Sequence, residues 1–173
     1  MKGEMRKGIK HQTFNIKHVT FNIKHLTKVM IEDIVKEKLG NRVLNWEKKN
    51  ERRYYIEIQK ENLQESVGIL FRDLGLRFSI ASGVDIIDNF EILYHFSSDH
   101  EDKFFSLRVK INKENPEVPS ISGIITAAKW IEREIWELLG INFVGHPGLK
   151  RLLLAEDWPE GVCPLRKDYN KNV

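Results

Sequence analysis

Histidine and cysteine side chains are the groups in this sequence best suited to nucleophilic or acid–base chemistry. Cys163 is the only cysteine, and His146 precedes it in the same C-terminal stretch. A hydrolase could use His146 together with Asp157 or Cys163, provided that these groups meet in space and a third group orients the imidazole. His146 stands beside Pro147 and Gly148, however, so a residue of a turn is the simpler interpretation.

The other histidines raise the question of a metal site. His18 and His25 end two copies of the hexapeptide TFNIKH, whereas His95 and His100 lie in or beside a predicted hairpin. Protein metal sites combine several His, Cys or carboxylate ligands at characteristic spacings, and such partners are missing here. A single cysteine also excludes an internal disulfide or an iron–sulfur site built by this chain alone. The sequence therefore predicts no catalytic residue, no metal and no cofactor.

Composition favours a cytosolic protein with one domain and extensions. The chain has 173 residues, 41% of them hydrophobic. No run approaches the roughly 18 apolar residues of a membrane-spanning helix, and the basic N-terminus lacks the apolar segment of a secretory signal. The charged fraction of 31%, mostly Lys and Glu, is typical of thermophile proteins.

Charge is distributed unevenly along the chain. Residues 1–30 contain seven Lys or Arg against Glu4 alone, a net charge of +6, so the remaining residues carry −3. A stand-alone α+β module that binds nucleic acid is an alternative function, but its folded part should then be basic. We therefore interpret residues 1–29 as a basic disordered tail. A further hypothesis is that translation starts at Met30, because MIEDIVKEKLG already forms a complete first helix.

Periodicity predicts an α+β fold between residues 30 and 139. Helical spacing indicates helices over 31–39 and 63–74, which Gly40 and Gly75 end. Alternation predicts strands over 53–59, 76–81, 90–96 and 105–111; in the second, Leu76, Phe78 and Ile80 share one side. A sheet with one solvent-exposed face favours antiparallel pairing of its strands. We expect a small, mainly antiparallel sheet with helices packed on one face.

The last predicted helix, over 124–139, has two different faces. Its buried stripe should contain the apolar residues Ile124, Ala128, Ile131, Ile135 and Leu138. The opposite face carries Lys129, Glu132, Arg133 and Trp136. A large aromatic residue between charges of both signs is typical of a partner-binding surface. The alternative is that the C-terminal segment of the same chain folds back and covers Trp136.

Residues 140–173 lack regular periodicity, which predicts an irregular extended C-terminal arm. An irregular stretch of about 30 residues is unusual inside a compact domain, and its backbone groups need hydrogen-bond partners. We expect it to lie across a second protein, with Trp158, Leu165 and Tyr169 as anchors. Charged side chains would fix the register of this contact; they are Arg151, Arg166, Lys167 and Asp168.

The C-terminal sequence resembles the thirty-kilodalton subunit family of respiratory complex I, the NADH dehydrogenase. The resemblance rests on ordered motifs: Glu132-Arg133-Glu134, Gly140-Ile141, Gly145-His146-Pro147, Arg151-Leu152, Asp157-Trp158 and Pro164-Leu165-Arg166-Lys167-Asp168-Tyr169. It extends through VPSISGII and more weakly to about Leu63. The sequence departs from the family pattern at Glu137, Gly148, Lys150 and Cys163. In its brevity the chain is most similar to the corresponding subunit of energy-converting membrane-bound nickel–iron hydrogenases.

The resemblance implies a non-catalytic subunit of the peripheral arm of a membrane-bound oxidoreductase. Its partners would be the large subunit, which holds the quinone or nickel–iron site, and the small iron–sulfur subunit. It would bind no nucleic acid and would reach the cytoplasmic face of the membrane only through the complex. Trp136 and the motif residues other than Gly140, Ile141 and Leu152 would bind the partners.

Overall fold

The computed structural model describes residues 30–169. The predictions about residues 1–29, including a start of translation at Met30, lie outside this range. Helix α1 spans Ile31–Leu39, as predicted, and Gly40 follows it with a φ of 53° that favours glycine. Helix α2, Leu63–Gly68, continues as a wider helical turn over Ile69–Asp73 and stops before Gly75, whose φ is 64°. Short 3₁₀ turns cover Gly40–Arg42 and Lys60–Asn62.

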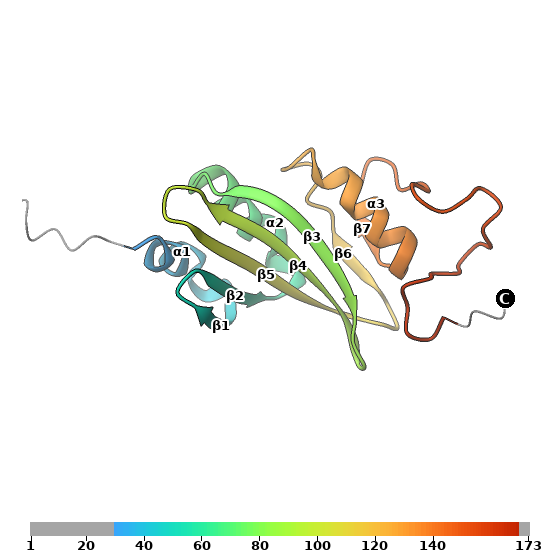
Figure 1. Ribbon diagram of the computed structural model, residues 1–173, viewed down its shortest axis with the longest axis horizontal. Coiled ribbons are helices and arrows are strands. Elements are labelled where there is room, and N and C mark those ends of the chain that lie inside the picture. Colours follow the sequence, from blue (N-terminus) through green and yellow to red (C-terminus); the bar gives the residue numbers. More distant parts are fainter. Residues whose placement is uncertain (1–29, 170–173) are drawn as a thin grey trace, which may run out of the picture. The chain divides into compact units, whose positions relative to one another are not determined.

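Five strands form one sheet in the order β1-β2-β5-β4-β3 (Figure 1). Their bounds are Val43–Asn50, Arg53–Ile58, Lys103–Asn112, Asn89–Ser98 and Arg77–Asp85 in that order. Neighbours are antiparallel except β2 and β5, which run parallel. The mainly antiparallel sheet is therefore confirmed. Strand β1 was missed because its residues follow no alternating pattern and include the charged Glu47, Lys48 and Lys49.

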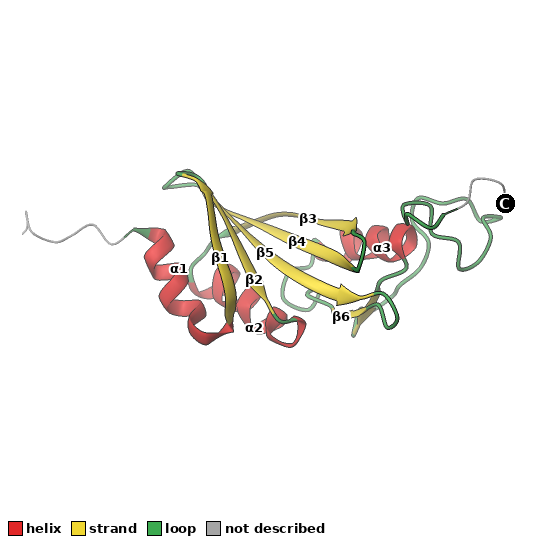
Figure 2. Ribbon diagram, turned by 90° about the horizontal axis from the view of Figure 1, so that it is seen from below, coloured by secondary structure: helices red, strands yellow, loops and turns green. Residues whose placement is uncertain are grey.

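The helices cover one face of this sheet, with α1 and α2 beneath it (Figure 2). Inward side chains of β2, β4 and β5 form the core; they are Tyr54, Ile56, Ile58, Phe90, Ile92, Tyr94, Phe96, Phe105, Leu107, Val109 and Ile111. Val35, Leu39, Leu63, Val67 and Leu70 meet them from α1 and α2. Burying these apolar side chains stabilises the fold. The alternation predicted for the three strands is thus confirmed, as are the helices on one face.

Strand β3 departs from its predicted alternation. A β-bulge lies between Phe78 and Ile80, so that Ile80 pairs with His95 and Ala81 with Tyr94. One extra residue reverses the faces of all side chains that follow it. Ala81 is therefore buried, and Ile80, predicted to share a side with Leu76 and Phe78, is 49% exposed. Beyond the bulge, Gly83 lies against Ile135 and Leu139 of the last helix.

That last helix, α3, spans Ala128–Leu139 and begins later than predicted because residues 122–127 form turns. It is flanked by strands β6, Glu117–Pro119, and β7, Asn142–Val144, which pair in parallel as a second small sheet. Residues 142–144 of the predicted irregular segment thus form a strand, and the described chain without helix or strand runs over 145–169; we call these residues the arm. Within the described residues, no helix is long and apolar enough to cross a membrane.

Candidate functional site

Glu132 is buried, although helical periodicity placed it on the exposed face of α3. Its side chain is 0% exposed. The turn that precedes α3 covers this face: the Ile121 amide donates to Glu132 Oε1 at 2.7 Å, and the Ser120 hydroxyl donates to Oε2 at 2.6 Å. The helix thus has two covered faces, one against β3 and one against residues 120–122. Glu132 therefore lies inside this part of the fold, whereas the sequence placed it on a partner-binding surface.

Burial dominates the electrostatics of the Glu132 carboxyl. Burial raises the pKa of its carboxyl to about 7, although the hydrogen bonds from Ser120 and Ile121 act in the opposite direction. The buried Tyr94 hydroxyl has no hydrogen-bond partner in the described part of the chain. Burial and the nearby Glu132 charge raise the pKa of Tyr94 well above its ordinary value.

The next turns of α3 hold the start of the arm through its backbone. Arg133 donates from Nε to the Lys150 carbonyl at 2.9 Å and from Nη2 to the Arg151 carbonyl at 2.6 Å. The Glu137 carboxylate accepts three consecutive backbone N–H groups, at 3.1, 2.8 and 2.8 Å. These belong to Leu152, Leu153 and Leu154. Burial by itself would raise the pKa of Glu137, but the three hydrogen bonds together lower it below its usual value.

Further along, arm residues hold one another. Arg151 donates to the carbonyls of Ala155, Glu156 and Trp158 at 2.8, 2.9 and 2.5 Å. Trp158 in turn donates from Nε1 to the Val162 carbonyl at 2.9 Å. The indole ring lies 6.3 Å from that of Tyr169. The Arg151 guanidinium is thus used within the chain, where the sequence predicted a contact with a partner.

The end of the arm crosses the C-terminal end of α3. The Leu165 amide donates to the Leu138 carbonyl at 3.0 Å, and a Cβ on Gly140 would lie 3.0 Å from Cys163 Sγ. The Lys167 amide donates to Asp85 at the end of β3 at 2.8 Å. Gly140 has a φ of 76°, so it is suited both to ending the helix and to this close approach.

His146 also has a structural environment. Its Nδ1 accepts from the Gly148 amide at 3.0 Å, so Nε2 carries the proton and donates to the Lys129 carbonyl at 3.1 Å. Because the backbone engages both ring nitrogens, the geometry favours the turn over the hydrolase alternative. No group of three or more metal-ligating side chains occurs among the described residues. The strand aromatics Phe90, Tyr94, Phe96 and Phe105 are buried, so their rings are not available to stack on bases.

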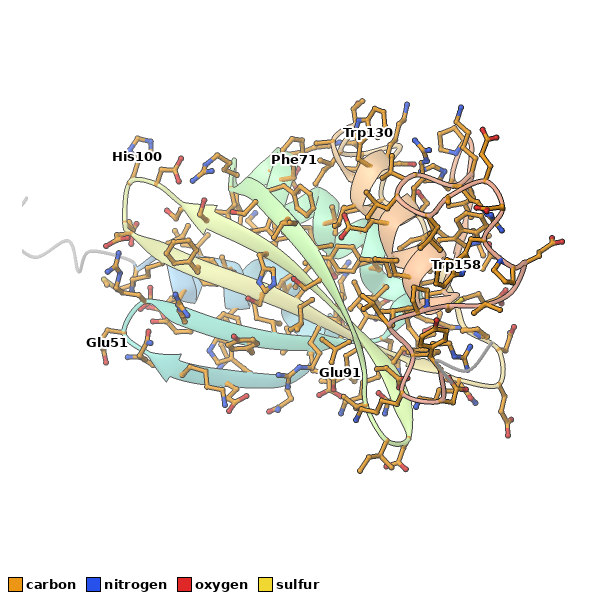
Figure 3. All side chains as sticks on the ribbon, turned by 45° about the vertical axis from the view of Figure 1, so that its right-hand side comes forward. Glu51, Phe71, Glu91, His100, Trp130 and Trp158 are labelled. Atoms are coloured by element: carbon orange, nitrogen blue, oxygen red, sulfur yellow. The ribbon has the colours of Figure 1, made fainter. Side chains whose placement is uncertain are left out.

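The remaining predicted site residues lie at the surface of α3 and the arm. Trp136 is half-buried next to residues of the arm, so the C-terminal segment covers it at most in part. With Trp158 it lines a cleft of about 450 Å³ that also contains Cys163 and Arg151. Figure 3 shows Trp158 in the arm and Trp130 near the beginning of α3. Half-buried residues are Arg133, Glu134, His146, Arg151, Trp158, Pro164, Arg166 and Tyr169; exposed ones are Gly145, Pro147, Asp157, Leu165, Lys167 and Asp168.

Sequence reasoning missed two residues that position the arm. Glu137 was noted only as a departure from the family pattern, and Asp85 was given no role. A carboxylate i+4 from Arg133 shares a helix face with it, so the spacing of Arg133 and Glu137 could have indicated a joint role. No local signal marks Asp85, because its partner Lys167 is far away in the sequence.

The sequence that forms this fold matches a known family. The model of the family described as "Respiratory-chain NADH dehydrogenase, 30 Kd subunit" matches residues 56–172. An NADH-quinone oxidoreductase subunit of Salinispora tropica is 35% identical over 66% of this chain and 49% of its own length. The equally named protein of Chloroherpeton thalassium is 34% identical over 79% of this chain and 58% of its own length. The chain belongs to the thirty-kilodalton subunit family, and it spans about half the length of these relatives.

A solved structure shares the fold. A chain of the membrane-bound sulfane sulfur reductase, an archaeal respiratory membrane complex, superposes with a TM-score of 0.72. The match covers 82% of this chain and 86% of the other at 20% identity. At this identity the likeness supports the architecture alone.

Proposed function

We propose that this chain is a non-catalytic subunit of a complex I-like oxidoreductase, in which the arm and the adjoining surface of α3 bind neighbouring subunits. The neighbours would be the large subunit with the quinone or nickel–iron site and the small iron–sulfur subunit. The chain would brace these two subunits in the peripheral arm, on the cytoplasmic side of the membrane. It would itself hold no cofactor. The family relation and the names of the relatives support this role.

One observation carries the proposal: the arm has a defined path but no buried side chain. None of the residues 145–169 is buried, whereas α3 and the sheet contain most of the core. The arm is positioned by hydrogen bonds between its backbone and the side chains of Arg133, Glu137 and Asp85. Its apolar side chains stay partly or fully exposed, and Leu153 and Leu165 are 60% and 59% exposed. A preformed segment that presents uncovered apolar side chains is suited to binding a protein.

The test replaces an arm side chain that supports nothing within the chain. In Leu153→Glu, the backbone hydrogen bond to Glu137 can remain, so the isolated subunit should fold normally. We expect recovery of the large and small subunits with the tagged variant to fall by roughly tenfold or more, as at an interface hot spot. Ile87→Glu is the matched control, because Ile87 is 83% exposed between β3 and β4. Equal recovery of the complex by both variants would contradict the proposal.

A further inference from the structure

The two edges of the five-stranded sheet differ in how they are protected. Strand β1 carries Glu47, Lys48 and Lys49 and has two register shifts, features that discourage pairing with another chain. Strand β3 has no charged residue from position 78 to 84, where the sequence reads FSIASGV. Among the described residues, the backbone of this stretch forms hydrogen bonds only with β4. An uncharged, unpaired edge of this kind is a template for another strand.

A groove runs between this edge and α3. It consists of two adjoining depressions of about 240 and 230 Å³ that share Ile80, Ile131 and Glu134. Leu138, Leu139 and Leu165 line the first depression, and Phe78 and Trp130 line the second. Ile80 is 49% and Trp130 61% exposed. Side chains projecting from an added strand would enter this groove.

Glu134 gives the groove a charge. Arg133, its neighbour in sequence, is directed elsewhere, to the arm and over the Trp130 ring at 5.2 Å. No ion pair within residues 30–169 uses Glu134. A segment lying in the groove would therefore be favoured by a Lys or Arg beside Glu134.

We propose that β3 binds an extended segment of a neighbouring subunit as a sixth strand, with apolar side chains in the groove and a basic side chain beside Glu134. Hydrogen bonds along the edge supply affinity, and the two depressions select alternate side chains. Leu165 connects the groove to the arm, so the two surfaces are continuous. The inference rests on the proposed function only in assuming that the chain works within a complex.

A second copy of the chain fits this edge less well. A continuous sheet made from two β3 strands would place both α3 helices on the same side, with their Glu134 carboxylates near each other. Like charges at an interface oppose association. The chain's own residues 1–29 are basic, and their pairing with β3 is an outcome that the experiment distinguishes.

The experiment measures backbone hydrogen exchange over 77–85 in the free full-length chain and in the purified complex. Amides of an edge strand that point away from the sheet should exchange in the free chain, and we expect them to slow roughly tenfold or more in the complex. The variant Ile80→Lys, a change at an exposed side chain, should lower recovery of the neighbouring subunit by roughly tenfold. Leu44→Lys on the β1 edge, where Leu44 is 56% exposed, should leave recovery unchanged.

Several results would overturn this inference. Equal exchange of β3 in the free chain and in the complex would exclude strand addition. Slow exchange in the free chain that is lost on deleting residues 1–29 would assign the edge to the chain's own tail. Slowing that depends on the concentration of the free chain would assign it to a second copy. If Leu153→Glu breaks the complex and Ile80→Lys does not, the arm proposal stands and strand addition fails; the opposite pattern supports strand addition and contradicts the arm proposal.

Discussion

Glu132 and Glu137 lie little more than one turn apart on α3, yet they join it to two different regions by opposite electrostatic means. Glu132 connects the helix to the turn before it, in surroundings that favour the neutral carboxyl. Glu137 connects the helix to the arm, where three N–H groups favour the carboxylate. The turn before α3 belongs to the core, whereas the arm is positioned mainly by polar contacts at the edge of the core. The two junctions should therefore fail under different conditions.

One helix can in this way serve the fold and the binding surface separately. Removing the Glu132 carboxyl leaves the buried Ser120 hydroxyl and Ile121 amide without this acceptor, and it should destabilise the whole domain. Removing the Glu137 carboxylate should release the arm while the core stays folded, because no arm side chain is buried. The following predictions test this separation.

The largest expected effect is that of Glu132→Ala on global stability. The substitution leaves the Ile121 amide without its acceptor and opens a cavity beside Tyr94, so we expect the free energy of unfolding to fall by about 3 kcal/mol. Urea denaturation near neutral pH measures this change. Glu132→Gln keeps the volume and an acceptor, and its smaller loss serves as the control. An unfolding free energy for Glu132→Ala within about 0.5 kcal/mol of the wild type would contradict a structural role.

The second prediction concerns the pH dependence of stability. In the folded protein the pKa of Glu132 is about 7, raised above its ordinary value of 4.5. The neutral Glu132 carboxyl therefore contributes fully to the free energy of unfolding below the pKa of the unfolded state. This contribution is lost as the pH rises through the pKa of the folded state. As the pH rises from about 5 to about 8, ionisation of Glu132 should lower the free energy of unfolding by about 2 kcal/mol. Glu132→Gln should flatten this decline in denaturation curves; an unchanged decline would exclude Glu132 as its source.

A local effect is expected for Glu137→Gln. The neutral amide accepts fewer and weaker hydrogen bonds than the carboxylate, so opening of the arm should become easier by about 1–2 kcal/mol. Exchange of the Leu152, Leu153 and Leu154 amides should accelerate, with little change in the global free energy of unfolding. The pKa of Glu137 is lowered in the folded protein. Its carboxylate therefore stabilises the arm at pH values above the pKa of the unfolded state, and this stabilisation is lost as the pH falls through the pKa of the folded state. Acid should therefore release the arm in the wild type and change the variant less.

The smallest effect should follow Arg133→Lys. An ammonium group replaces the planar guanidinium that donates to two carbonyls from Nε and Nη2, so it cannot reproduce the same fork. We expect the free energy of opening the arm to fall by about 0.5–1 kcal/mol, and the free energy of global unfolding to stay unchanged. Limited proteolysis of the arm measures this change. Protection equal to the wild type would mean that Glu137 holds the arm without Arg133.

Residue patterns along the chain were sufficient to predict most regular elements and the family. Alternating side chains indicated β2, β4 and β5 because one face of each must be buried, and glycines at Gly40, Gly75 and Gly140 marked the ends of helices because they adopt positive φ. The ordered C-terminal motifs indicated the family to which the chain belongs. These features depend on residues close together in the sequence.

Packing between segments, in contrast, set which motif residues point inward. Glu132 is buried because residues 120–122 cover a face of α3 that helical periodicity alone leaves open. Ile80 is exposed because a bulge in β3 reverses its side, and a bulge is set by pairing with β4. Arg151 serves the arm itself because the local path of the chain brings three carbonyls to its guanidinium. Such contacts depend on distant segments or on a specific loop path, which residue patterns do not encode.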